Sequence, residues 1–194
     1  MTISAPTLRL AVLPRGLATD AVLVAGGAGL IALSAQVSFG HPVPITGQTF
    51  AVLLVGASLG AVRGTASLML YLWLGVAGAP IYAHHDHGWS VITGSSGGYI
   101  VGFVLASAVT GYLAERRWDR QISSAIAAML TGNVIIYLVG LPWLAVVLNT
   151  NLEKTLELGL YPFVPGDTFK LYLAAAALPG AWRLVGAAKR RTGP

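Results

Sequence analysis

Long stretches of this chain carry no charged residue, and this feature restricts its possible folds more than any other. Residues 98–114 and 122–148 contain no Asp, Glu, Lys or Arg, and the remaining charges gather in short clusters between such stretches. Only 10% of all residues are charged, whereas soluble proteins average about 25%. The stretches are too continuously apolar for the alternating strands of a membrane barrel. The sequence therefore predicts an all-α integral-membrane protein, with residues 1–194 forming a single domain.

The region 50–77 is apolar except for Arg63-Gly64 near its middle. It is either one long helix that buries an arginine or two short helices that meet at a turn. An arginine at the bilayer centre costs about 2.5–3.5 kcal/mol on insertion scales, which favours two helices. Short helices must be sheltered by their neighbours or thin the membrane locally. The other transmembrane helices are predicted at residues 20–38, 98–114, 122–148 and 167–187.

Positive charge supports the same choice. With two helices in 50–77 the chain is a bundle of six transmembrane helices with both termini cytoplasmic, and residues 1–17 form a cytoplasmic N-terminal arm. All the clustered basic residues then lie on the cytoplasmic side, where such residues are enriched. These residues are Arg9, Arg15, Arg63, Arg116, Arg117, Arg120, Lys189, Arg190 and Arg191.

Charge and cysteine content exclude several other functions. The net charge of +5 comes from basic residues beside apolar segments, so it indicates membrane orientation rather than binding to nucleic acid. The chain has no cysteine, which excludes disulfides and thiolate metal sites. It also lacks a Gly-Lys-Ser/Thr phosphate-binding sequence, so any ATP hydrolysis would belong to another subunit.

Two opposite charges stand at the start of the last apolar stretch, in Pro165-Gly166-Asp167-Thr168-Phe169-Lys170. The sequence predicts that Asp167 caps this helix and that Lys170 lies one turn inside it on the same face. Together they offer acceptors, donors and a positive charge to a small anion that also carries N–H groups. The alternative is a structural ion pair at the membrane surface.

Other polar residues are expected to converge near this pair, in the outer half of the bundle or its covering loops. They would line a pocket together with aromatic residues such as Tyr82 and Trp143. Asn133 would lie near mid-membrane, where its amide serves either the pocket or a contact between helices. The predicted substrate-binding residues are Thr46, Gln48, Ser95, Ser96, Tyr99, Asn133, Asp167 and Lys170.

The cluster His84-His85-Asp86-His87 has side chains that zinc or nickel accepts as ligands. Adjacent residues in a flexible loop rarely face one ion, so a solvated loop is the favoured interpretation, and no metal or cofactor is predicted. No nucleophile with a matched base is evident either.

Four motifs occur together in one order and spacing, and they extend along nearly the whole chain. They are Pro44-Ile45-Thr46-Gly47-Gln48-Thr49, Gly75-Val76-Ala77-Gly78-Ala79-Pro80-Ile81-Tyr82, Gly94-Ser95-Ser96-Gly97-Gly98-Tyr99 and the Pro165–Lys170 segment. In these motifs the chain resembles the BioY family of biotin transporters. It departs from that pattern at Ser95-Ser96, where Pro-Thr is commoner, and in its histidine cluster.

The resemblance implies a substrate-binding S component of an energy-coupling factor (ECF) transporter, which captures biotin near the outer face of the cell membrane. Asp167 and Lys170 would belong to the biotin site, and the turns at 46–48 and 95–99 would shape or close it. The first helix has a face of small residues, Ala21, Ala25 and Gly29. This face would meet a transmembrane coupling subunit driven by paired ATPase subunits.

Three alternatives remain open at this stage. The chain could be an S component for another vitamin, a membrane enzyme that uses a metal held by the histidine loop, or a structural membrane subunit without a ligand. The last would need another account of the polar groups that gather on one side.

Overall fold

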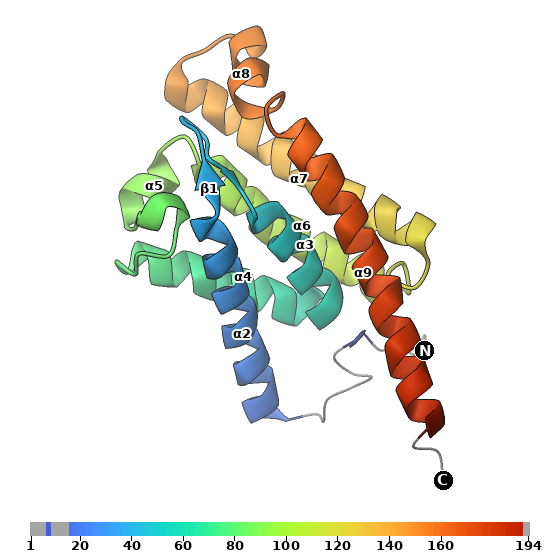
Figure 1. Cartoon of the computed structure of the whole chain (residues 1–194). Helices are drawn as coiled ribbons and strands as arrows, with labels where there is room; N and C mark the ends of the chain where they lie inside the picture. Colours follow the sequence, from blue (N-terminus) through green and yellow to red (C-terminus); the bar gives the residue numbers. More distant parts are fainter. Residues whose placement is uncertain (1–6, 9–15, 192–194) are drawn as a thin grey trace.

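The computed structural model describes residues 7–8 and 16–191, and these form a bundle of helices (Figure 1). The elements are α2 (Leu17–Gln36), β1 (Ser38–Phe39), β2 (Ile45–Thr46), α3 (Gln48–Leu59), α4 (Ala61–Val76), the 3₁₀ turn η1 (Ala83–His85), α5 (Trp89–Thr93), α6 (Gly97–Glu115), α7 (Ile122–Leu148), α8 (Leu152–Gly159) and α9 (Val164–Arg191). Among the described residues α2, α6 and α7 are long and apolar enough to cross a membrane, and α3 and α4 are shorter apolar helices. The helical, multi-pass prediction is therefore confirmed.

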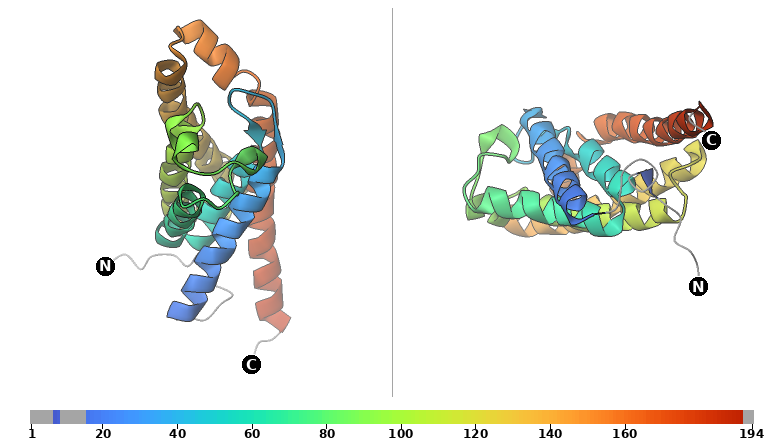
Figure 2. Two further views of the ribbon diagram at one scale, coloured as in Figure 1. Left: turned by 90° about the vertical axis from the view of Figure 1, so that its left-hand side faces the viewer. Right: turned by 90° about the horizontal axis from the view of Figure 1, so that it is seen from below.

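Helix α6 occupies the centre of the bundle. In the apolar stretch of α6, 61% of the residues are buried, compared with 17% in that of α2. It packs against α3, α4 and α7, while α9 contacts α7 and α3. The view from below shows α2, α3 and α9 on one side of a layer that contains α4 and α6 (Figure 2). The most apolar surface is thus left on the outer helices, where lipid can cover it.

The region 50–77 forms two helices, as predicted, but they meet at Gly60 rather than at Arg63-Gly64. Gly60 has φ of +86°, which residues with a Cβ rarely adopt. The first free N–H of α4, on Ala61, donates to Glu115 Oε1 at 3.0 Å. Arg63 lies in the first turn of α4 and pairs with Asp20 of α2, with 2.8 Å between guanidinium and carboxylate. The turn thus forms where glycine permits it, and the arginine finds a partner.

Glycines let the two short helices lie very close to α6. A Cβ placed on Gly56 would come within 2.6 Å of the Ser107 carbonyl oxygen, and one on Gly64 within 2.8 Å of the Gly56 Cα. A Cβ on Gly111 would lie 2.4 Å from the Ala61 nitrogen. These approaches shelter α3 and α4 inside the bundle, as their short length requires.

The predicted turn between the first two helices contains a small hairpin. Strands β1 and β2 are antiparallel, with Ser38 opposite Thr46 and Phe39 opposite Ile45. The hairpin and α8 lie at the end of the bundle opposite to the start of α2 and the end of α9 (Figure 1). The polar segment after α7 forms the short surface helix α8.

The prediction that Asp167 caps the last helix is wrong. Helix α9 begins at Val164, and the Asp167 N–H donates to the Phe163 carbonyl at 2.8 Å. Proline is compatible with the first turn of a helix, because the N–H it lacks would be unpaired there. Asp167 therefore lies within the first turn of α9, and its carboxylate is free to make tertiary contacts.

The opposite end of α9 is fixed to the loop between α6 and α7. Trp182 Nε1 donates to Asp119 Oδ2, and the Arg120 guanidinium lies 4.4 Å from the centre of the Trp182 ring. Asp119 is only 1% exposed, and burial raises the pKa of its carboxyl group. Of the predicted N-terminal arm, Thr7 and Leu8 are described: Thr7 is buried and Leu8 packs against the core. Gly16 and Leu17 are described as well, and Leu17 already belongs to α2. Residues 1–6 and 9–15 of the arm, and the side chains of Lys189, Arg190 and Arg191, lie outside the described residues.

We expect Gly111→Ala to destabilise the protein by about 1–3 kcal/mol, because the added methyl group meets the backbone of α4. The measurement is thermal unfolding in detergent. Gly29→Ala is the matched control, since the space at Gly29 is open within 4 Å. Equal melting temperatures for the two variants would contradict the close packing of α4 on α6.

Candidate functional site

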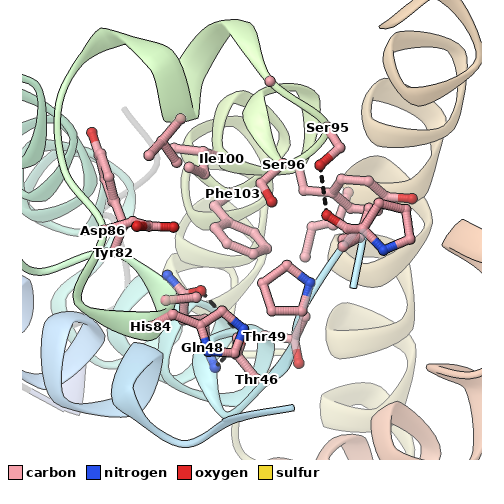
Figure 3. A pocket seen from close by; sticks show the side chains of 18 of the residues that line it. Thr46, Gln48, Thr49, Tyr82, His84, Asp86, Ser95, Ser96, Ile100 and Phe103 are labelled. Carbon is pink, nitrogen blue, oxygen red and sulfur yellow. Dashed lines mark hydrogen bonds between the residues drawn. The ribbon is translucent and has the colours of Figure 1, made fainter. Parts of the chain in front are cut away.

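A cavity of about 340 Å³ lies between the hairpin, the turns that flank α5 and the adjoining ends of the long helices (Figure 3). Its volume falls in the range of about 300–1,000 Å³ found for small-molecule sites. The apolar and aromatic part of its lining includes Ile100, Phe103, Ile136 and Phe163. The polar part includes His41, Thr46, Gln48, Thr49, His84, Asp86, Ser90, Ser95, Ser96, Tyr137, Asp167 and Lys170.

The ammonium group of Lys170 is held by three acceptors. It donates to the Thr46 carbonyl oxygen at 2.6 Å, to Thr49 Oγ1 at 3.2 Å and to Asp167 Oδ1 at 3.0 Å. An ammonium has three N–H donors, so all of them are used within the protein. The side chain is 19% exposed, so part of this cation faces the cavity with its direction fixed.

Asp167 is more deeply placed, with its side chain 5% exposed. Its Oδ1 accepts from Thr49 Oγ1 at 2.9 Å as well as from Lys170, and its Oδ2 accepts from the Tyr137 hydroxyl. A carboxylate offers about four lone pairs, so Oδ2 retains capacity for one more donor. Three groups, one each from α3, α7 and α9, thus form one network around the carboxylate.

A second polar group lies at the start of α3. Gln48 Nε2 donates to the Tyr71 hydroxyl at 2.7 Å, and Thr46 Oγ1 donates to Gln48 Oε1 at 3.2 Å. The Tyr71 ring meets the Tyr82 ring edge to face, with centroids 5.4 Å apart. Tyr82 donates to the Leu72 carbonyl at 2.7 Å, and burial raises its pKa to about 12, so the phenol stays neutral. This wall therefore presents fixed, uncharged hydrogen-bonding groups.

The third wall joins the turn before α6 to the hairpin. Ser95 donates to the Pro42 carbonyl at 2.6 Å across this junction (Figure 3). Tyr99 presents its ring to the cavity and stacks on Phe163, while its hydroxyl donates to the Gly159 carbonyl at 2.9 Å. The cavity therefore joins segments that are far apart in sequence.

The structure brings seven of the eight predicted site residues to this one cavity. The exception is Asn133, which is 7% exposed and does not line it. Asn133 lies one helical turn before Tyr137, next to the level where Gly132 packs on Leu53. Trp143 was also expected in the lining, but instead its Nε1 donates to the Gly94 carbonyl at 3.0 Å.

Several lining residues were missed by the sequence interpretation. Tyr137 and Thr49 complete the Asp167 network, and Tyr71 completes that of Gln48. Tyr137 follows Asn133 by four residues in an otherwise apolar helix, so the same face of α7 carried a usable signal. His41 had no such signal, because its position depends on the fold of the hairpin loop.

The histidine cluster contributes only part of its residues to the cavity. His84 and Asp86 line it, whereas His85 and His87 do not. Within residues 7–8 and 16–191, no group of three His, Cys, Asp or Glu side chains is placed to hold a metal ion.

A model for the family described as BioY matches residues 5–187. The chain belongs to the BioY family. It is 34% identical to the biotin transporter BioY of Rhizobium etli, over 80% of this chain and 89% of that protein. It is 38% identical to the probable biotin transporter BioY of Pyrococcus horikoshii, over 87% of this chain and 98% of that protein.

The BioY fold is also represented among solved structures. The crystal structure of an S-component for biotin from an ECF-type ABC transporter matches with a TM-score of 0.74 and 26% sequence identity. The match covers 91% of this chain and 93% of that one. The helical arrangement described above is therefore similar to that of an S-component for biotin.

We expect the Asp167–Lys170 pair to show strong energetic coupling. Asp167→Asn or Lys170→Met alone should cost about 3 kcal/mol, because each leaves the partner's charge buried without its counter-ion. The double variant should cost less than the sum, since no such charge remains. Thermal unfolding of the four proteins in detergent measures this. Additive losses would mean that the two charges do not depend on each other.

Proposed function

We propose that this chain is the high-affinity biotin-binding S component of an ECF transporter, which captures biotin at the extracellular face and delivers it to the cytoplasm. The observation that carries the proposal is the Asp167 network, which faces a cavity whose other surfaces are largely apolar and aromatic. Membership of the BioY family and the names of its relatives support the same ligand.

Biotin matches this cavity chemically. Its ureido ring carries two N–H donors and one carbonyl acceptor, and its middle part is apolar. Asp167 Oδ2 can accept one ureido N–H beside Tyr137, and the ring can rest against aromatic side chains such as Phe103 and Phe163. Thr46, Gln48, Ser95, Ser96 and Tyr99 complete the proposed site with Lys170. Asn133 does not line the cavity and is left out of the proposed site.

The proposed topology has six transmembrane helices, namely α2, α3, α4, α6, α7 and α9, with both termini on the cytoplasmic side of the cell membrane. The positions of Arg63 at the α3–α4 turn and of Arg116, Arg117 and Arg120 after α6 support this orientation. The cavity then opens toward the outside. Residues 1–17 remain the proposed cytoplasmic arm.

Transport would need further subunits, because the sequence has no phosphate-binding loop. A transmembrane coupling subunit and paired ATPase subunits are the proposed partners, by analogy with the transporter named for the matching solved structure. The chain itself is a transport protein of the BioY family and not an enzyme.

The deciding experiment is binding of biotin to detergent-purified protein by calorimetry or radioligand, with riboflavin and thiamine as controls. We expect one biotin per chain, a nanomolar dissociation constant and no binding of the controls. Binding of riboflavin or thiamine in place of biotin would indicate an S component for another vitamin. Folded protein that binds none of the three would overturn the proposal.

We further expect Lys170→Ala and Asp167→Asn each to weaken biotin binding by about 2–5 kcal/mol, because each leaves a desolvated charge unpaired. Lys154→Ala is the matched control. Lys154 also pairs with an acid three residues away, Glu157, but both of these side chains are more than half exposed on α8. An equal effect of Lys154→Ala and Lys170→Ala would remove Lys170 from the site.

A further inference from the structure

Biotin also has a carboxylate, and the deep charged network offers it no free cation. All three N–H donors of Lys170 are engaged by Thr46, Thr49 and Asp167. A ligand carboxylate at this position would have to replace one of those acceptors and would lie beside the Asp167 carboxylate. Such like-charge contact is unfavourable in a site shielded from water. The carboxylate therefore needs another partner.

Among the described lining residues, the other groups able to carry positive charge are His41 and His84. They come from separate segments, the hairpin loop and the turn between α4 and α5 (Figure 3). Their rings are stacked nearly parallel, with centroids 5.0 Å apart and an interplanar angle of 5°. Both residues are exposed, so a proton can reach either ring. Two imidazoles therefore lie together at the outer rim of the cavity.

Ser38 Oγ holds the His84 turn against the hairpin. It accepts the His84 backbone N–H at 3.3 Å and lies 3.2 Å from His84 Nδ1. This contact occupies Nδ1 and leaves Nε2 as the ring nitrogen that can donate to a ligand.

We propose that His41 and His84 bind the ligand's carboxylate at the rim, while Asp167 binds its ureido end in depth. This inference rests on the proposed function, since it assumes biotin as the ligand. Imidazoles gain a proton between about pH 8 and pH 5, and a bound carboxylate stabilises the protonated form. Binding should therefore take up a proton and become tighter as the pH falls through this range.

Other charged or titratable groups lie near the two histidines and influence the binding of the ligand carboxylate. Asp86 lines the same cavity from the His84 turn, and it opposes the ligand's charge while favouring protonated rings. His85 and His87 flank Asp86 outside the lining, and Tyr82 is neutral. On α9, Asp167 and Lys170 cancel each other's charge. Besides Lys170, the two rim histidines are thus the described lining residues that can carry positive charge toward the ligand.

The test compares biotin with biotinamide, which has the same ring system but no charge. We expect the protein to bind biotin about tenfold more tightly than the amide at pH 6, as one charge-assisted hydrogen bond provides. This ratio should shrink at pH 8. The carboxyl group itself stays ionised throughout, because such groups titrate near about pH 4.3. Calorimetry in buffers of different ionisation enthalpy should detect proton uptake with biotin and none with the amide.

The variants are His41→Asn and His84→Asn, since asparagine is uncharged and tolerates the positive φ of His84, 60°. Each should lower the biotin-to-biotinamide ratio toward one. His85→Asn is the matched control, because His85 has the same φ but does not line the cavity.

The outcomes separate the two proposals. Equal affinities for biotin and biotinamide, unchanged in the histidine variants and across pH, would overturn the carboxylate site and leave the biotin function standing. A folded protein that binds neither compound would overturn the function and, with it, this inference. Loss of amide binding in the histidine variants would mean that they disturb the cavity itself, which also contradicts a role confined to the carboxylate.

Discussion

The cost of keeping a carboxylate and an ammonium out of water governs the organisation of this bundle. Asp167 and Lys170 lie among apolar helices, where either charge alone would be very unfavourable. The ion pair alone does not offset the cost of burying both charges. Thr49 of α3, Tyr137 of α7 and the Thr46 carbonyl supply the remaining hydrogen bonds. The pair therefore fixes α3, α7 and α9 relative to one another at the level of the cavity. The same groups that make the charges tolerable also line the cavity.

Close helix packing lower in the bundle makes the cavity possible. Gly56, Gly64 and Gly111 bring α3 and α4 against α6 without side chains between the backbones. Helix α3 can then end and α4 begin at Gly60, where Glu115 accepts the free N–H of Ala61 at the start of α4. Glycines also bring backbone close to the cavity walls, where a Cβ on Gly140 would lie 2.6 Å from the Tyr99 ring.

The sequence predicted the helices well because their signals are strong and local. The cost of burying Arg63 and the positions of the basic clusters indicated two short helices instead of one. Seven of the eight predicted site residues line one cavity. The errors concern properties that only tertiary structure determines. Asp167 was expected as a cap, but α9 extends three residues further toward its N-terminus, to Val164. Asn133 has the polarity of a site residue and shares a face of α7 with Tyr137, but it lies one turn away along the helix and does not line the cavity. The stacking of His41 on His84 depends on two loops that have no sequence periodicity.

The internal neutrality of the Asp167–Lys170 pair has a consequence for energetics across the membrane. Because the pair contributes no net charge, the occupied floor of the cavity carries only the charge of its ligand. An anion carried inward against an interior-negative potential meets opposing electrical work of about 2.3 kcal/mol per charge for each 100 mV. A proton carried with that anion on a rim imidazole would remove this work. The net charge that crosses the membrane would then depend on the ligand and on the groups that face it.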